Sequence, residues 1–401
     1  MKIAFLTPRR RRVALPHCSS ALFALVLGGL ALPTALAAHE AASGAQMPLS
    51  QFAPATLRQD MFKGVYEVIE LPGRNQIAVA ASPSFEAGTS GYLDLLDADD
   101  LSPVRRLELP RRSFALGLDA ERGRIYVGNT LDGALTVLDL HSGLILETVQ
   151  LGKPEGTGFE HTRMIAVDDV TGRVLVTSPS PAGTVWIIDP ENGYSVQRLD
   201  DAGMWAAGLA VDSARGRAYS TGGGMQEVLV LDVKTGERLG TFSTGDTTTS
   251  QKEESAHFFV NAALDSSGAR LFAVDADTGS LFTFDTESGA VINKAPIGLG
   301  ALDVVYAPTF DRIFVTYRGV SQEQPEGSGG VVVLNAQDYS RVADIPLPVH
   351  PNSLALGAAG EVLYVTVKAP MEETHPQHRA GAADSVLRID LKAVPGLTTT
   401  P

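Results

Sequence analysis

Phe114-Ala-Leu-Gly-Leu-Asp119, followed by Arg124-Ile-Tyr-Val-Gly-Asn-Thr130 and Leu135-Thr-Val-Leu-Asp139, is the stretch that decides the fold, because its pattern returns along the whole chain. Each copy has an Ala/Leu-rich segment, a polar turn, a segment like Ile-Tyr-Val-x-Asn, and an aliphatic segment that ends in Asp. A turn with Gly and a more polar segment complete the copy. Short aliphatic runs between turn residues predict strands. Four strands in a fixed, repeated order indicate a repeat fold.

The copies can be counted from the residue that ends the third strand of each. These residues are Asp97, Asp139, Asp189, Asp232, Asp285, Asn335 and Asp390. They lie 42 to 55 residues apart, which suits four strands with loops of variable length. Seven such ends predict an all-β fold, a seven-bladed β-propeller of four-stranded antiparallel blades. We interpret the recurring acids as structural, because Asp accepts hydrogen bonds from the amides of its own turn.

The last copy, His350 to Leu391, supplies only three strands. We expect Thr56 to Phe62 to be the missing outer strand, so that an N-terminal strand closes the last blade and no long sheet edge is left open. The predicted domain organisation is a signal peptide at 1–37, an N-terminal linker at 38–55, the propeller at 56–392 and a C-terminal tail at 393–401.

The first 37 residues have the pattern of a secretory leader. Lys2 and Arg9 to Arg12 precede an apolar run, and Ala35-Leu-Ala37 fits the cleavage rule. The run is shorter and more interrupted than a membrane span requires, so we expect no span after cleavage and a periplasmic or secreted protein. An uncleaved anchor is the alternative. The single cysteine, Cys18, lies in the leader, so the mature chain is expected to have no thiol or disulfide chemistry.

Cleavage would leave 27 basic and 46 acidic residues, a net charge of −19. This balance opposes broad nucleic-acid binding, whose affinity comes mainly from Lys and Arg on phosphates. It still allows a local basic patch. We expect a monomer.

Five segments of the chain carry a family resemblance. Ile125-Tyr-Val-Gly-Asn129, Ile313-Phe-Val-Thr-Tyr317 and Leu363-Tyr-Val-Thr-Val367 resemble the repeat that names the YVTN propellers. His257-Phe-Phe-Val-Asn261 and His350-Pro-Asn-Ser-Leu-Ala-Leu356 are similar to segments of the YncE family of exported bacterial propellers. The resemblance, from about Leu57 to Leu391, implies the propeller fold and export, but no settled catalytic activity.

The resemblance also makes single-stranded DNA a candidate partner, since at least one family member is associated with it. Gln76-Ile-Ala-Val-Ala80, however, lacks an aromatic residue where such a member could stack a tryptophan on a base. Stacking is a large part of sequence-tolerant single-strand affinity. Together with the acidic charge, this departure argues against DNA binding.

In a propeller the inner strands line a central channel, and their beginnings bring residues of distant blades to one face. The polar residues expected at this channel mouth are Asn129, Arg163, His257, Asn261, Arg318, His350, Asn352 and Lys368. The apolar walls expected there are Phe114, Trp205 and Phe258. Such a set in an acidic chain predicts a local positive site for a small anionic ligand. The competing interpretation is that these groups only satisfy exposed backbone and hold water.

A metal site is a weaker prediction. His257 and His350 begin equivalent strands and, with a carboxylate such as Glu254, have the donor types of a transition-metal site. No third ligand is assured, so they are weak candidates, and no cofactor is expected. The segment His375-Pro-Gln-His378 is interpreted as a solvated loop.

The chain has no Gly-x-Ser-x-Gly or His-Glu-x-x-His pattern. The sequence therefore predicts a non-catalytic binding or scaffold protein, which holds a small anionic ligand or a protein partner of the cell envelope at the channel mouth. The first alternative is a propeller enzyme of the lyase or lactonase type with a His/Arg/Asn site, favoured by fold analogy alone. An enzyme should show a hydrogen-bonded His–carboxylate pair with a shifted pKa. Single-stranded DNA binding is the further alternative.

Overall fold

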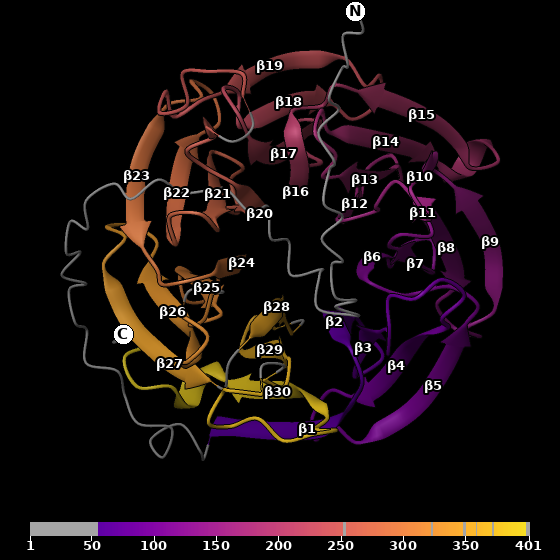
Figure 1. Cartoon of the computed structure of the whole chain (residues 1–401), viewed down its shortest axis with the longest axis vertical. Helices are drawn as coiled ribbons and strands as arrows, with labels where there is room; N and C mark the ends of the chain where they lie inside the picture. Colours follow the sequence, from indigo (N-terminus) through magenta and orange to yellow (C-terminus); the bar gives the residue numbers. More distant parts are fainter. Residues whose placement is uncertain are drawn as a thin grey trace, which may run out of the picture. The chain divides into compact units, whose positions relative to one another are not determined.

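Seven four-stranded antiparallel sheets, arranged as blades in a ring, make up the computed structural model of the chain (Figure 1). The predicted all-β, seven-bladed propeller is confirmed. The structure describes residues 55–397 except 252–253, 322–323, 348–349, 358 and 371–372. The predicted leader, the linker up to residue 54 and residues 398–401 lie outside the described residues. Within the described part no helix is long and apolar enough to cross a membrane.

Each blade runs from an inner strand to an outer strand at the rim. Blade 1 contains β2 (Val65–Leu71), β3 (Gln76–Ala81), β4 (Gly91–Asp97) and β5 (Pro103–Leu109). Blade 2 contains β6 (Ala115–Asp119), β7 (Arg124–Asn129), β8 (Ala134–Asp139) and β9 (Ile145–Gln150). Blade 3 contains β12 (Ile165–Val167), β13 (Val174–Ser178), β14 (Thr184–Asp189) and β15 (Ser195–Asp200). A small hairpin of β10 (Pro154–Glu155) and β11 (Gly158–Phe159) precedes the third blade, and a short 3-10 turn, η2 (Pro190–Asn192), lies within it.

The next three blades repeat this order. Blade 4 contains β16 (Met204–Asp212), β17 (Arg217–Gly223), β18 (Val228–Asp232) and β19 (Arg238–Phe242). Blade 5 contains β20 (Phe259–Leu264), β21 (Arg270–Asp275), β22 (Ser280–Asp285) and β23 (Val291–Pro296). Blade 6 contains β24 (Ala301–Ala307), β25 (Arg312–Tyr317), β26 (Gly329–Asn335) and β27 (Arg341–Leu347). The seventh blade contains β28 (Pro351–Leu356), β29 (Val362–Val367) and β30 (Asp384–Asp390), with the 3-10 turn η4 (Leu391–Ala393) after it.

The fourth strand of the seventh blade comes from the other end of the chain. β1 (Thr56–Phe62) pairs antiparallel with β30, which confirms the predicted closing strand. Figure 1 shows the indigo β1 beside the yellow β30. The hydroxyl of Ser385 donates a hydrogen bond to Asp60 Oδ1 at 2.6 Å, and Phe62 is fully buried between blades 1 and 7.

The segment after β30 also packs onto the propeller. Leu391, Val394 and Leu397 are buried in a cluster of apolar side chains from blades 6 and 7. The described part of the segment predicted as a tail, residues 393–397, thus contributes to the core.

The acids that end the third strands form turns, as the sequence indicated. Asp139 Oδ1 accepts hydrogen bonds from the main-chain N–H of His141 at 3.1 Å and of Ser142 at 2.7 Å. Gly143 then takes a φ of 71°, which a residue with a side chain adopts only with strain. The same arrangement at Asp232 and Asp285 shows that these carboxylates are structural.

Neighbouring blades are joined by apolar packing and by arginines that reach across the joint. Fully buried Tyr126 of blade 2 and Trp186 of blade 3, for example, belong to one apolar cluster. Nearer the rim, Arg173 Nη1 of blade 3 donates to the carbonyl of Lys234 in blade 4 at 2.5 Å. Other arginines brace adjacent blades in the same way: Arg74, Arg215 and Arg270.

Candidate functional site

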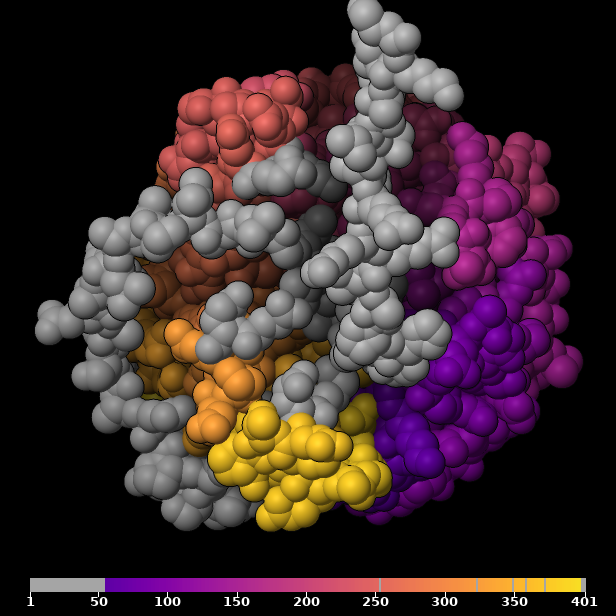
Figure 2. Space-filling view, in the orientation of Figure 1, coloured from indigo at the N-terminus to yellow at the C-terminus, as the bar shows by residue number. Residues whose placement is uncertain are grey.

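The inner strands of the seven blades meet around the centre of the ring, where each contacts the inner strands of both neighbouring blades. All seven begin at one face, which we call the mouth face. This face also carries the loops between second and third strands. Figure 2 shows two of its connections, the loop after β19 (salmon) and the β29–β30 loop (yellow), standing toward the reader.

Five inner strands have a register irregularity near their first residues. A bulge of this kind leaves a residue unpaired and turns side chains out of the regular alternation. Glu67 and Asp303 lie inside two of these irregularities, and Asn261 directly follows a third. All three side chains are buried.

Arg163, which precedes β12 in blade 3, connects these buried groups. Its Nη2 donates to Asn261 Oδ1 at 3.3 Å, and its Nη1 lies 4.0 Å from Glu67 Oε1. Asn261 Nδ2 in turn donates to Asp303 Oδ1 at 2.8 Å. Blades 3 and 5 are separated by blade 4, so these contacts reach across the centre of the ring.

The two carboxyl groups of this network are also held by the main chain. Glu67 Oε2 accepts the N–H of Leu116 at 2.6 Å, and Asp303 Oδ2 accepts the N–H of Leu354 at 2.7 Å. Burial raises the pKa of Glu67 to about 8 despite the attraction of Arg163, and it also raises the pKa of Asp303. At pH 7 Glu67 is therefore mostly protonated and neutralises Arg163 only weakly.

A second group of polar residues lies where blade 7 begins. The main-chain N–H of His350 donates to the carbonyl of Arg318 at 3.3 Å, and that of Lys368 donates to the carbonyl of His350 at 3.0 Å. Asn352 Nδ2 donates to the carbonyl of Tyr66 at 3.2 Å, which ties this group to blade 1. Arg318, His350, Asn352 and Lys368 are all partly exposed.

Two aromatic rings connect the buried network with this second group. The rings of Tyr66 and Phe114 have centroids 4.5 Å apart. Lys368 Nζ lies 3.7 Å from the centroid of Tyr66, and the guanidinium carbon of Arg163 lies 5.5 Å from that of Phe114. The aromatic faces thus hold cations. We call the combined set the axial site: Tyr66, Phe114, Arg163, Arg318, His350, Asn352 and Lys368.

Positive charge in the axial site is not balanced. Neither Arg318 nor Lys368 forms an ion pair with any described residue. Burial and the neighbouring Arg163 lower the pKa of Arg318 to about 10, while burial and Arg318 lower that of Lys368 to about 8, although Asp384 opposes the shift. Burial, Arg318 and Lys368 lower the pKa of His350 to about 4, so its imidazole is neutral at pH 7.

Six of the eight predicted site residues therefore belong to the axial site or contact it directly: Arg163, Asn261, Arg318, His350, Asn352 and Lys368. Asn129 has a different place, because its amide donates to the carbonyl of Arg112 at 3.0 Å and accepts from Thr136 at 2.7 Å. These bonds fix the end of β7 and leave Asn129 fully buried.

His257 also has other partners. Its Nδ1 lies 2.7 Å from Asp275 Oδ2 and its Nε2 lies 2.8 Å from Asp246 Oδ2. The two carboxylates raise its pKa against the effect of burial. No hydrogen bond or ring contact joins His257 to His350, and no group of three His, Cys, Asp or Glu among the described residues is placed to hold a metal.

The remaining candidates lie near this histidine or in the last blade. Trp205 and Phe258 are buried in an edge-to-face contact with centroids 5.5 Å apart, apart from the axial site. Glu254 accepts the hydroxyl of Thr249 at 2.6 Å. His375 differs from the expected solvated loop: it is buried, and its Nε2 lies 3.0 Å from the carbonyl of Gly327.

Sequence reasoning missed Tyr66, Glu67 and Asp303. These residues are hidden by the irregular starts of β2 and β24, where a polar residue interrupts an otherwise aliphatic strand. An alignment of the seven inner-strand starts, position by position, could have found these three residues.

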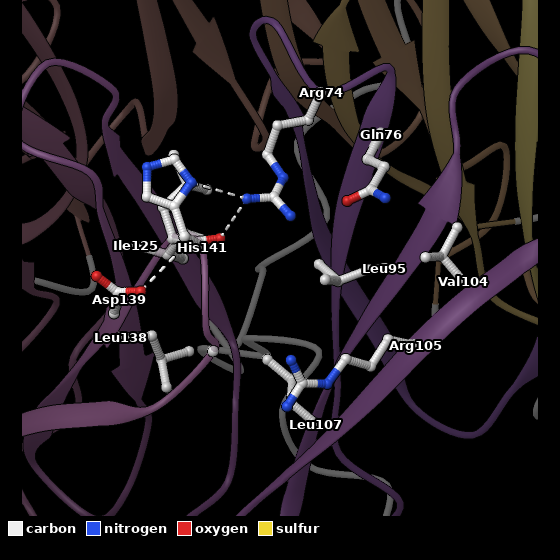
Figure 3. Close-up of a pocket in the computed structure, with 12 residues that line it drawn as sticks. Arg74, Gln76, Leu95, Val104, Arg105, Leu107, Ile125, Leu138, Asp139 and His141 are labelled. Atoms are coloured by element: carbon white, nitrogen blue, oxygen red, sulfur yellow. Dashed lines mark hydrogen bonds between the residues drawn. The ribbon is translucent and has the colours of Figure 1, made fainter.

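A separate cleft lies between the outer parts of blades 1 and 2 (Figure 3). Its floor is formed mainly by leucine and isoleucine side chains. At its edge Arg74 Nη1 donates to the carbonyl of Leu140 at 2.9 Å, and Arg105 Nη1 donates to that of Ser142 at 2.7 Å. Because both guanidinium groups brace blade 1 against blade 2, we interpret this cleft as part of the joint between blades.

No family model matches the chain. Proteins described as uncharacterized protein YncE are similar over most of their length. The YncE of Salmonella typhi is 28% identical over 342 residues, which cover 84% of this chain and 90% of the relative. The YncE of Escherichia coli strain K12 is 28% identical over 347 residues, 85% of this chain and 92% of the relative. These similarities and the seven four-stranded blades agree with the resemblance in the repeats: the chain is a seven-bladed β-propeller that is similar to the YncE proteins over most of its length.

Proposed function

We propose that this chain is an exported, non-catalytic binding protein that holds a small anionic ligand at the axial site. The observation that carries the proposal is the unbalanced positive charge of Arg318 and Lys368, which form no ion pair with any described residue. Buried or half-buried charges are normally paired, because an unpaired charge out of water costs free energy. A bound anion would supply the missing partner.

The form of the site also supports a small ligand. Arg318, His350, Asn352 and Lys368 are partly exposed. Guanidinium and ammonium groups bind carboxylate and phosphate oxygens by charge-assisted hydrogen bonds. Phe114 and Tyr66 offer an apolar wall beside these donors. Few polar groups next to an apolar wall are typical of small-molecule sites.

The enzyme alternative has less support. The His–carboxylate pair that would mark a general base is His257–Asp275, but Asp246 occupies the second ring nitrogen. In the axial site His350 is neutral at pH 7 and has no carboxylate partner among the described residues. Neither imidazole therefore has the arrangement of an oriented base with a free nitrogen.

Single-stranded nucleic acid is the second candidate, and one observation favours it. Phe85, Tyr66 and Phe114 form a row of aromatic rings beside Arg163 and Lys368. Bases stack on aromatic faces while phosphates contact cations, so this row has the required chemistry. The acidic charge of the whole chain opposes this candidate, since it repels a long polyanion more strongly than a small one.

Calorimetric titration of the protein with phosphate, citrate, oxalate and a short single-stranded oligonucleotide tests the proposal. We expect at least one small anion to bind and Arg318→Met and Lys368→Met each to weaken it about tenfold or more. Lys234→Met, at an exposed turn of blade 4, is the matched control and should leave binding unchanged. Absence of small-anion binding to the wild type, or equal loss in the control, would overturn the proposal. Oligonucleotide binding alone would favour the second candidate.

A further inference from the structure

Lys368 differs from the other lysines of the chain. The described lysines are Lys63, Lys153, Lys234, Lys294, Lys368 and Lys392. Five of them are exposed, and only Lys368 is partly buried. An ammonium group that serves merely as a positive charge has no need of this position, because an exposed lysine at the mouth would supply the same charge.

The groups around Lys368 reduce its preference for the charged form. Its Nζ lies over the ring of Tyr66 rather than beside a carboxylate. Asp384 favours the charged form of Lys368, but the oxygens of Asp384 already accept the N–H groups of Val65 at 2.9 Å and Ala369 at 2.7 Å. The ring face favours the ammonium form, but it does not replace a carboxylate.

Positive groups approach Lys368 from the adjacent blade. Arg318 follows β25, and its carbonyl is linked through the main chain of His350 to the N–H of Lys368. His350 carries no charge at pH 7, because burial, Arg318, Lys368 and His375 all lower its pKa. Burial beside a fixed guanidinium is one of the ways in which proteins turn lysine into a nucleophile. With a pKa of about 8, about one Lys368 in ten is a neutral amine at pH 7.

We infer that Lys368 captures the carbonyl group of a 2-oxo carboxylate as an imine, with the carboxylate of the same molecule held by Arg318. The inference rests on the proposed anion site and names its ligand class. The main-chain hydrogen bonds through His350 link Arg318 and Lys368, which follow strands of adjacent blades, and the charge of Arg318 acts on Lys368. A ligand whose carboxylate is next to its carbonyl group offers one group to each of these two side chains. Asn352, whose amide donates to the carbonyl of Tyr66, and the neutral His350 lie beside this pair.

The chemistry requires no further reactant. The neutral amine of Lys368 adds its electron pair to the carbonyl carbon, and one of its two N–H protons moves to the carbonyl oxygen. The hydroxyl group formed in this way then leaves with the second N–H proton as water, and a C=N bond remains. The products are one imine and one water molecule, and the reaction is reversible without oxidation or reduction.

The test is reductive trapping of the intact protein. Wild type is incubated with glyoxylate or pyruvate, treated with sodium cyanoborohydride and analysed by intact mass and peptide mapping. We expect one adduct, on Lys368, whose formation rate rises with pH up to about 8. Lys368→Arg should abolish it and Lys234→Arg should leave it unchanged. Arg318→Met should slow it about tenfold, whereas methylglyoxal, which has the carbonyl groups but no carboxylate, should label much more slowly than glyoxylate.

Binding and trapping fail in distinguishable ways. If oxalate binds calorimetrically and Lys368 is not trapped by either oxo acid, the imine inference is wrong while the anion site stands. If neither binding nor trapping occurs, both are wrong. Adducts spread evenly over the exposed lysines would also overturn the inference. Circular dichroism and the melting temperature of Lys368→Arg show whether loss of the adduct has a structural cause.

Discussion

The guanidinium of Arg163 donates a hydrogen bond to Asn261 Oδ1 at 3.3 Å, although the two residues belong to blades 3 and 5 and are 98 residues apart in the chain. Through Asn261 the bond continues to Asp303 of blade 6, and on its other side Arg163 approaches Glu67 of blade 1. One side chain thus links four blades at the centre of the ring. The positive charge of Arg163 also lowers the pKa of Arg318 in the axial site.

Replacing Glu67 by Gln should change how stability depends on pH. The folded-state pKa of Glu67, about 8, is above its ordinary value of 4.5, so the folded protein holds an extra proton between these values. Wild type therefore loses stability as pH rises from about 4.5 to 8, and Gln cannot show this loss. The melting temperature of Glu67→Gln minus that of wild type should increase between pH 5 and pH 8. Glu237→Gln, at an exposed position, should show no such trend; a flat difference for Glu67→Gln would contradict the prediction.

Arg318→Met should stabilise the ligand-free protein. Burial and Arg163 disfavour the charge of Arg318 in the folded state, so removal of the charge removes a cost. We expect a melting temperature a few degrees above that of wild type in buffer without multivalent anions. Anions that bind the wild type should no longer raise it. A destabilised variant would indicate that Arg318 has a structural role instead.

His257→Gln should lower the free energy of unfolding more in mild acid than in alkali. Asp275 and Asp246 raise the folded-state pKa of His257, so their contribution is complete below its ordinary value of 6.5 and is lost as pH rises through the folded pKa. We expect a cost of about 2 kcal/mol at pH 6 by chemical denaturation and less at pH 9. His378→Gln, in the β29–β30 loop, is the control and should show little effect at either pH.

Removal of residues 38–62 should strongly destabilise the propeller, because it deletes β1 and leaves β30 as an open edge. A parallel removal of residues 38–54 keeps β1. We expect the melting temperature of the first variant to fall by about 10 °C or more relative to the second, since a whole strand and the buried Phe62 are lost. Equal melting temperatures would contradict the closure by β1.

Arg173→Met tests the bracing between blades. The substitution removes the hydrogen bond to the carbonyl of Lys234 and the ion pair with Asp189, whose atoms lie 2.9 Å apart. We expect a loss of about 1 kcal/mol in the free energy of unfolding. Arg379→Met is the control, because within the described part of the chain Arg379 donates to the carbonyls of Pro376 and His378 in its own loop. A change of the same size in both variants would show that the contact between blades is unimportant.

The repeat was sufficient to predict the blades, because strand order and turn acids such as Asp139 recur at each copy. It also located the closing strand, since the count of strands in the last copy was one short. The axial site was only partly predictable. Arg318 and Lys368 follow regular strands and could be placed by position, whereas Glu67 and Asp303 lie in register irregularities that the alternating pattern does not reveal.

His257 shows a second limit of sequence reasoning. Its position at the start of an inner strand was read correctly, but its partner Asp246 lies in a long connection whose path the repeat does not determine. His350, which directly precedes the inner strand of blade 7, has cations instead of carboxylates around it. Two histidines just before inner strands thus have opposite pKa shifts, because the groups around them differ between the two blades.

The pairing of β1 with β30 also determines the order of events in folding. Thr56 to Phe62 is synthesised before every blade, but its partner, Asp384 to Asp390, is made only after the first six blades. The first strand must therefore wait, unpaired, until more than 300 residues have been added, and the final step joins positions as distant as Asp60 and Ser385. Contacts of such long sequence separation form slowly. During that interval two strand edges are exposed to other chains, so the ring is most prone to aggregate just before it closes.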